Sequence, residues 1–180
     1  MTLTAEPQVV STLQVATIPP EPTALESIAT LAQRAVDLAW SRDARLAVAE
    51  SCTAGAVAAA LAIADGASAC FQGGVVAYSP AAKYALLGVP PGPVIGHEAA
   101  RQMARSALER FDADVAIATT GVIGPAREER QPVGTLWVGG CSRRQPALAM
   151  RKELAGERPG AVRDLAVQEA LRMLIVLLEQ

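Results

Sequence analysis

The sequence has few of the residues on which several common functions depend. Its 180 residues contain one histidine, His97, so neither a metal site built on several imidazoles nor a Ser-His-Asp triad is indicated. Aromatic residues make up 3% of the chain and the formal net charge is −2. Because neither stacking platforms nor a basic surface is available, we expect no nucleic-acid partner. No metal and no cofactor are expected either.

Cysteine is also scarce. Cys52, Cys70 and Cys141 are odd in number and widely spaced, without a Cys-x-x-Cys pair, so a disulfide framework is not predicted. Residues 1–22 contain no Lys or Arg and do not resemble a secretory signal. The longest apolar run, residues 54–64, is too short to span a bilayer. These absences predict a cytoplasmic protein with buried, reduced thiols and no membrane partner.

The chain is instead rich in small and aliphatic residues, since 51% of it is hydrophobic. That composition predicts one domain over residues 23–180, preceded by a flexible tail over residues 1–22 that contains four prolines. Thr23 and Glu26 have the spacing of a capping box, which predicts a helix that begins there and ends near Ser41.

Apolar residues alternate between strand and helix spacing along the rest of the chain. The pattern predicts strands at residues 46–49, 71–78, 115–118, 133–139 and 148–154, and helices at residues 53–64, 81–87, 97–111 and 160–178. Gly66 is expected to end the first of these helices, and Gly73 and Gly74 to mark a bulge or a close contact. Alternating strands and helices indicate a layered α/β fold with a mixed, partly parallel sheet.

The most informative stretch is residues 49–55, Ala-Glu-Ser-Cys-Thr-Ala-Gly, which joins a predicted strand to a predicted helix. Ser51 at such a turn suits an exposed nucleophile or the floor of an anion site. Alternatively, Ser51 and Thr53 simply cap the helix. Hydroxyl groups follow two other predicted strands, at residues 78–79 and 119–120. Because ligands bind beyond the carboxyl ends of parallel strands, this agreement favours a functional site.

A serine needs a base, and Lys83 is the candidate, because burial among apolar neighbours lowers the pKa of an amine. The Tyr78 hydroxyl could relay the proton. The alternative is an ordinary surface lysine. A Ser-x-x-Lys motif is absent, since Ala54 occupies the lysine position. The dinucleotide-binding glycine fingerprint is also absent, so a nicotinamide-dependent dehydrogenase that uses Tyr78 and Lys83 is a weak alternative.

Six motifs occur in an order that resembles the C-terminal domain of CinA over roughly residues 24–178. They lie at residues 49–55, 74–83, 87–89, 120–125, 132–135 and 156–158. The resemblance implies a three-layer α/β/α sandwich, usually a homodimer or a higher homo-oligomer. Stand-alone versions of this domain are nicotinamide-nucleotide amidohydrolases. They deamidate nicotinamide mononucleotide to nicotinate mononucleotide and ammonia, a step of NAD salvage in the pyridine nucleotide cycle.

The resemblance also assigns roles to residues. Ser51 is expected to be the nucleophile, Tyr78 the proton relay and Lys83 the base, while Thr120 contacts the substrate or the transition state. Arg158 is expected to pair with the substrate phosphate. Backbone N–H groups of residues 52–55 are expected to hold the oxyanion. The expected substrate-binding residues are Cys52, Thr53, Gly55, Gly121, Gly124 and Arg158.

The chain departs from the family pattern mainly at residues 126–131, where a glycine pair is replaced by Arg127 and Glu128. Glycine allows close approach to a ligand and a positive φ, so a ligand contact is at risk in this loop. Ala54 replaces another family glycine, and Gly96 stands where a helix-capping serine is usual. The altered loop motivates a second hypothesis: a catalytically weak or inactive relative that binds a nucleotide or a protein partner.

Overall fold

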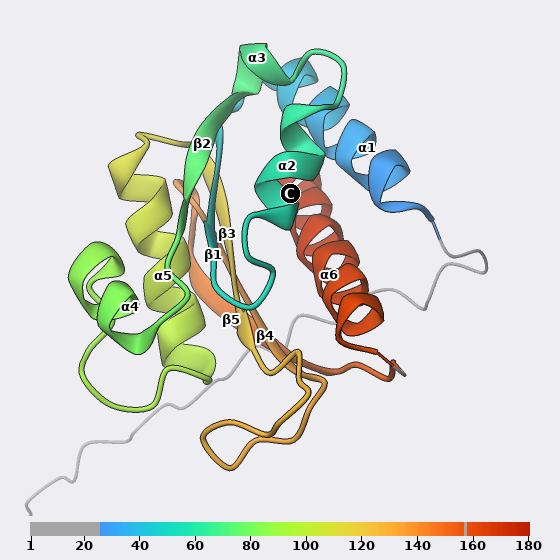
Figure 1. Cartoon of the computed structure of the whole chain (residues 1–180). Coiled ribbons are helices and arrows are strands. Elements are labelled where there is room, and N and C mark those ends of the chain that lie inside the picture. The colour runs from blue at the N-terminus through green and yellow to red at the C-terminus, as the bar shows by residue number, and fades with distance from the viewer. Residues whose placement is uncertain (1–25, 157) are drawn as a thin grey trace, which may run out of the picture.

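A five-stranded sheet forms the centre of this computed structural model, which describes residues 26–156 and 158–180 (Figure 1). The strands are β1 (Leu46–Glu50), β2 (Phe71–Val76), β3 (Val115–Gly121), β4 (Thr135–Ser142) and β5 (Gln145–Glu153). Their order across the sheet is β2-β1-β3-β4-β5. Strands β2, β1 and β3 are parallel, whereas β4 and β5 are antiparallel to their neighbours. The predicted mixed, partly parallel sheet is therefore confirmed.

Helices cover both faces of the sheet. They are α1 (Ile28–Ser41), α2 (Ala56–Ala62), α3 (Ala67–Cys70), α4 (Pro80–Leu87), α5 (His97–Arg110) and α6 (Pro159–Glu179). Helices α1, α2 and α6 pack together on one face, and α4 and α5 lie on the other (Figure 1). The expected three-layer α/β/α arrangement is confirmed.

The two faces of the sheet are packed with residues of different size. Leu46, Val48, Ile117 and Leu136 point toward α1 and α6, where they meet other large aliphatic side chains. The opposite face presents mainly alanines to the alanine-rich side of α5. A Cβ added to Gly139 would overlap the backbone oxygen of Ala100 in α5. Small residues thus let α5 lie very close to the sheet.

Several helix boundaries differ from the sequence expectation. Thr23 lies outside the described residues, and α1 begins at Ile28 because the Ser27 hydroxyl caps it by accepting the Thr30 N–H at 3.0 Å. The predicted end at Ser41 is confirmed. Helix α2 is shorter than predicted, and Gly66 begins the short helix α3 instead of ending α2.

The predicted bulge near the glycine pair is present. Leu46 is paired with Phe71 but Ala47 with Gly73, so Gln72 has no partner in the ladder between β1 and β2. Gly74 has no room for a Cβ, which would collide with Val48. No helix among the described residues combines the length and apolar character needed to cross a membrane.

Candidate active site

The carboxyl ends of the parallel strands β2, β1 and β3, where the sequence predicted a site, lie side by side at one end of the sheet. The Ser51 N–H donates to the Thr119 carbonyl at 3.0 Å, and the Ala77 N–H donates to the Glu50 carbonyl at 2.8 Å. The turn at Ser51 therefore lies between the segment that follows β2 and the end of β3. After β1 the chain continues to β2, which lies on one side of β1. The next strand in the chain, β3, lies on the other side of β1. Such a reversal of strand order is where ligands bind in open α/β sheets.

Glu50 builds the turn that carries the serine. Its buried carboxyl group accepts hydrogen bonds from the Thr53 hydroxyl at 2.6 Å and from the N–H groups of Gly55, Val57 and Ala58 at 2.9, 3.1 and 2.8 Å. These are amides of the first turn of α2, which has no acidic residue of its own. A carboxylate in this position satisfies the free N–H groups and complements the helix dipole.

The alternative that Ser51 and Thr53 cap α2 is wrong. The N-cap residue is Gly55, with φ of 94°, and no side chain of the N-cap forms the capping bond. The Thr53 hydroxyl donates to Glu50 and accepts from Thr119 over 2.7 Å. Both hydroxyl-bearing residues of the turn are thus left without a capping role, and Glu50 performs it instead.

Two amides of the turn, those of Cys52 and Thr53, have no recorded hydrogen bond to another described residue, and the Cys52 N–H contacts its own thiol. The Ala54 N–H donates to the Ser51 carbonyl at 3.0 Å and the Gly55 N–H donates to Glu50. Of the residues 52–55 expected to hold an oxyanion, only the first two therefore have N–H groups available. The Cys52 N–H belongs to the residue after Ser51, the position that supplies one oxyanion donor in serine hydrolases with a nucleophile at a strand-to-helix turn.

Ser51 is buried, with 4% of its surface exposed, yet its hydroxyl is loosely held. Its one recorded contact among the described residues is the backbone oxygen of Tyr78 at 3.5 Å, which is long for a hydroxyl hydrogen bond. The hydroxyl is consequently free to turn toward a base or a substrate.

Lys83 is buried, with 3% of its surface exposed, which overturns the alternative of a surface lysine. Its Nζ donates to Thr120 Oγ1 at 3.0 Å. No carboxylate forms an ion pair with it in the part of the chain that the structure describes. Burial lowers the pKa of the Lys83 amine, although the negative charges of Glu128 and Glu129 oppose the shift. A lysine in such surroundings can act as a neutral base.

Thr120 connects Lys83 to the segment before α5. Its hydroxyl accepts the Lys83 hydrogen bond and donates its own proton to the Val94 carbonyl at 2.7 Å. The N–H groups of Val94 and Ile95 in turn donate to the Glu129 carboxylate at 2.9 to 3.0 Å. A continuous chain of hydrogen bonds thus runs from Lys83 to the loop after β3.

Tyr78 and Arg158 are not brought into this network. The Tyr78 side chain is 70% exposed, and its hydroxyl has no recorded hydrogen bond within residues 26–156 and 158–180. Arg158 is exposed at the start of α6, at the same edge of the sheet as the Ser51 turn (Figure 1). The relay and phosphate-binding roles of these two residues remain predictions.

The glycines of the motifs have backbone roles. A Cβ on Gly121 would overlap the Thr135 carbonyl of the neighbouring strand, and Gly124 has φ of 101° and lies against Val133. Glycine is needed at both positions for close packing or a left-handed conformation. Substrate contacts by Gly55, Gly121 and Gly124 remain predictions.

Cys52 has the properties of a buried thiol. It is 8% exposed, and burial raises its pKa to about 12 in spite of the nearby Lys83 charge. Because the thiolate is the reactive form of cysteine, Cys52 is a poor nucleophile. Cys70 and Cys141 are also buried and free, as the sequence predicts.

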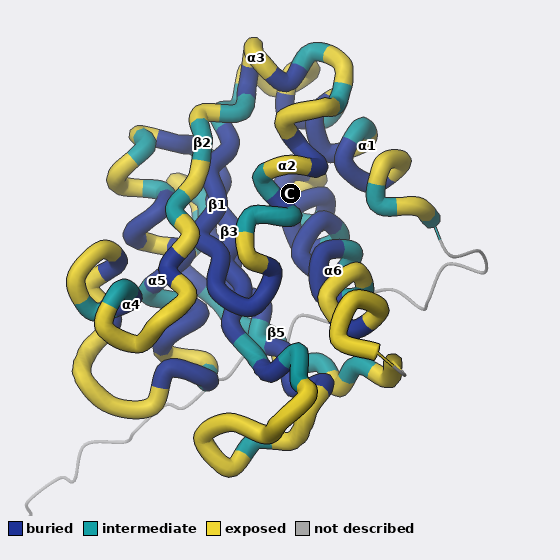
Figure 2. Tube along the Cα trace, in the orientation of Figure 1, coloured by how far each residue is buried: buried dark blue, intermediate teal, exposed yellow. Residues whose placement is uncertain are grey.

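The altered loop forms a tight hairpin. Glu128 and Gln131 exchange backbone hydrogen bonds of 3.3 and 2.7 Å, and Glu129 and Arg130 between them have φ of 47° and 64°. The left-handed positions fall on these two residues and not on Arg127 and Glu128, where the sequence locates the missing glycines. Figure 2 shows this hairpin as an exposed segment that projects from one end of the molecule.

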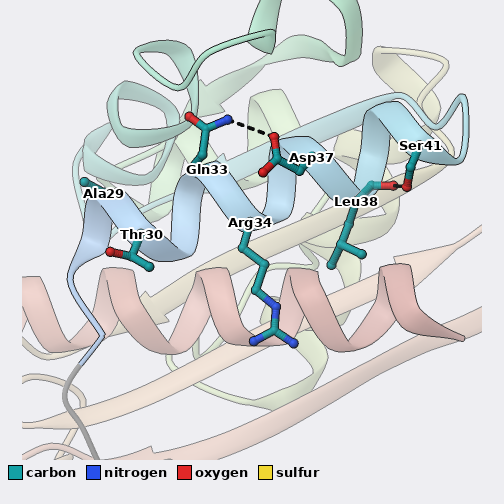
Figure 3. Close-up of a pocket in the computed structure, with 7 residues that line it drawn as sticks. All are labelled: Ala29, Thr30, Gln33, Arg34, Asp37, Leu38 and Ser41. Atoms are coloured by element: carbon teal, nitrogen blue, oxygen red, sulfur yellow. Dashed lines mark hydrogen bonds between the residues drawn. The ribbon is translucent and has the colours of Figure 1, made fainter.

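A surface depression away from these residues lies along the outer side of α1 (Figure 3). Its lining side chains are Ala29, Thr30, Gln33, Arg34, Asp37, Leu38 and Ser41. The polar ones are already paired: Gln33 donates to Asp37 at 2.9 Å, and Arg34 bonds Glu179 at 2.7 Å. This depression contains none of the predicted site residues.

Sequence reasoning missed the roles of Glu50 and Glu129. Glu50 had a signal, because a lone acidic residue ends an apolar strand directly before a helix whose first turn lacks one. Glu129 had none, because its partners Val94 and Ile95 are 35 and 34 residues away in the sequence.

Comparison with known proteins shows which family this chain resembles in sequence. The sequence matches the family described as the CinA C-terminal domain over residues 28–178. It is 43% identical over 132 residues to a CinA-like protein of Chlorobaculum tepidum, an alignment that covers 70% of this chain and 31% of that protein. A CinA-like protein of Frankia casuarinae is 40% identical over 135 residues, 72% of this chain and 31% of its own length. The chain thus spans about a third of these curated relatives.

Solved structures match over nearly their whole length. A CinA superfamily protein from Klebsiella pneumoniae superposes with a TM-score of 0.81 at 31% identity, covering 86% of this chain and 99% of that one. The competence/damage inducible protein CihA from Agrobacterium tumefaciens gives a TM-score of 0.81 at 31% identity, covering 89% and 100%.

Proposed function

The chain belongs to the CinA C-terminal domain family, and from this premise we propose that it is an amidohydrolase that deamidates nicotinamide mononucleotide to nicotinate mononucleotide and ammonia. The observation that carries the proposal is Lys83, a buried amine bonded to Thr120 and without a carboxylate partner among the described residues, at the strand edge that holds Ser51. A neutral lysine beside a serine is a recognised way to activate a nucleophile without histidine.

In the proposed reaction, Ser51 Oγ attacks the carboxamide carbon while its proton passes to the neutral Lys83 amine. The N–H groups of Cys52 and Thr53 stabilise the oxyanion of the tetrahedral intermediate. The Lys83 ammonium then returns the proton to the leaving nitrogen, and ammonia departs. Water, deprotonated by Lys83, attacks the resulting ester. The Lys83 ammonium then returns that proton to Ser51 Oγ as the bond to the acyl group breaks and the acid product leaves.

Arg158 and Tyr78 are proposed to act on the bound substrate. Arg158 would pair with the phosphate at the edge of the site, where a guanidinium can form two parallel hydrogen bonds. Tyr78 would act as the relay after its exposed ring turns inward over the bound substrate. We also propose that the protein assembles as a homodimer.

The test is ammonia release from nicotinamide mononucleotide, measured together with formation of nicotinate mononucleotide. Nicotinamide riboside and simple carboxamides serve as comparison substrates, since Arg158 is expected to favour the phosphorylated one. We expect turnover that is lost in Ser51→Ala and retained in Ser41→Ala, a control far from the site. Folded protein that releases no ammonia from any of these compounds would refute the proposal.

A second candidate function is nucleotide binding without turnover. It is favoured by the hairpin at residues 126–131, where the family's glycine pair is replaced and Glu129 occupies two backbone N–H groups. Thermal stabilisation by nicotinamide mononucleotide without product would support this candidate, and product formation would exclude it.

A further inference from the structure

Among the described residues, the recorded side-chain hydrogen bonds that join the hairpin after β3 to the site all come from Glu129. Its carboxylate oxygens accept the Val94 N–H at 2.9 and 3.0 Å and the Ile95 N–H at 2.9 Å. Both residues that donate are buried, Val94 completely and Ile95 with 5% of its surface exposed. Without Glu129 these two amides would have no recorded partner among the described residues. An unpaired buried N–H is costly, so the contact determines where this segment lies.

Val94 is held from two sides. Its N–H binds Glu129, and its carbonyl accepts the proton of Thr120 Oγ1 at 2.7 Å. A threonine hydroxyl has one proton to donate, and here Val94 takes it. The oxygen of Thr120 is therefore turned toward Lys83 as an acceptor, at 3.0 Å from Nζ.

We propose that Glu129 is a positioning residue of the active site: by fixing the Val94–Ile95 segment, it fixes the carbonyl that orients Thr120 and, through Thr120, the amine of Lys83. Its kinetic consequence rests on the proposed amidohydrolase function.

The conformation of the hairpin supports the proposal independently. Glu129 and Arg130 both have positive φ in a two-residue turn, a conformation for which asparagine and glycine are the usual residues. Such positions persist only where other contacts hold them. The bonds from Val94 and Ile95 to the Glu129 side chain are contacts of that kind.

Glu128 offers a matched control. It lies beside Glu129 in the same hairpin, and its negative charge also raises the pKa of Lys83. Unlike Glu129, its side chain forms no recorded hydrogen bond in the described part of the chain, and only its backbone pairs with Gln131. Glu128→Gln therefore removes a charge near Lys83 without removing a hydrogen bond to the segment before α5.

The kinetic experiment compares Glu128→Gln, Glu129→Gln and Glu129→Ala over pH. Because each variant removes a negative charge that favours the ammonium form, all three should move the acidic limb of kcat to lower pH. The plateau kcat should stay within about twofold in Glu128→Gln, fall about tenfold in Glu129→Gln and fall further in Glu129→Ala, with KM changed less than about threefold. Equal plateau values in the Glu128 and Glu129 variants would overturn the proposal.

A second measurement decides the question even if wild-type protein releases no ammonia, in which case only the proposed function fails. The methyl resonance of Thr120 and the amide exchange rates of Val94 and Ile95 are recorded by NMR for wild type, Glu128→Ala and Glu129→Ala. Glu129→Ala should shift the Thr120 methyl resonance and accelerate exchange at both amides by about tenfold or more, whereas Glu128→Ala should do neither. An unchanged Thr120 resonance in folded Glu129→Ala would overturn the positioning role.

Discussion

Lys83 and Thr120 form a buried hydrogen bond of 3.0 Å that joins helix α4 to the end of strand β3. The amine is separated from Thr120 by 37 residues in the sequence and has no carboxylate partner among the residues that the structure describes. A charged amine in this position would have the Thr120 hydroxyl as its one recorded hydrogen-bond partner, and only the more distant charges of Glu128 and Glu129 would favour it. The pair therefore favours a neutral lysine, and this preference can be measured.

Replacing Lys83 with Met should raise stability at neutral pH while abolishing turnover. Burial lowers the folded-state pKa of Lys83 below its ordinary value of 10.5, so the unfolded chain binds more protons between the two pKa values. Between these two pKa values the stability of the wild type rises with pH. Below the folded-state pKa, the full free-energy cost of burying the charged amine is present. The gain from Lys83→Met should therefore be largest at neutral pH and shrink as pH approaches 10.5.

Urea denaturation of both proteins at pH 7 and pH 9.5 measures this difference. Lys152→Met, at a lysine that is paired with Glu169 at 3.0 Å, is the comparison and should not stabilise. A Lys83→Met protein that is less stable than wild type at pH 7 would contradict the expected penalty.

Cys52→Ala should retain the proposed turnover, with kcat within about threefold of wild type, because the thiol of Cys52 is protonated and buried. Iodoacetamide should label Cys52 in the native protein far more slowly than in the urea-unfolded protein at pH 8. Mass spectrometry of the alkylated protein follows this directly. Rapid native labelling accompanied by inactivation would point to cysteine chemistry in place of Ser51.

Glu50→Ala should destabilise the protein by about 3 kcal/mol, since it leaves several buried or half-buried donors without an acceptor. Glu50→Gln keeps one acceptor oxygen and should cost less. Glu179→Gln, which alters an exposed ion pair with Arg34, should change stability by less than about 0.5 kcal/mol. Chemical denaturation of the three variants tests this ranking of their free energies of unfolding. Similar stabilities for Glu50→Ala and Glu179→Gln would disprove the role of Glu50 in the turn.

Ala54→Gly should stabilise the chain by about 0.5 to 1 kcal/mol. Ala54 is exposed and has φ of 54°, a left-handed conformation that costs an L-residue about 1–2 kcal/mol, which exceeds the entropic cost of glycine. Ala54→Val should destabilise, because a β-branched side chain tolerates this conformation worse. Thermal melts of both variants give the answer, and a lower melting temperature for Ala54→Gly would contradict the strain at this position.

The sequence predicted the sheet and most helices because their signals are local. Ser79 and Pro80 begin α4 as expected, and the apolar spacing of residues 97–111 matches α5 within one residue. Helix α3 escaped prediction because four residues are too few to show a period. The start of α1 was placed too early because Ser27, not Thr23, provides the capping hydroxyl that the structure describes.

The site was predictable only in part, for a related reason. Ser51 and Thr120 lie at the ends of neighbouring parallel strands, and Lys83 follows the third parallel strand, so pattern and topology were sufficient to place all three at one end of the sheet. The actual partners of their side chains were not predictable. Whether Thr120 donates to Val94, or Glu129 reaches the segment before α5, depends on side-chain geometry between segments that are distant in the sequence.

The contact of Gly139 with the Ala100 backbone has a consequence for how this protein can change over generations. On the α1 and α6 face, one large aliphatic residue can replace another if its neighbours adjust. On the α5 face no side chain lies between strand and helix at that point, so no neighbour can adjust in compensation. Lineages that carry this fold should therefore diversify on one side of the sheet and stay nearly fixed on the other, and a saturation library would reveal that asymmetry without any assay of function.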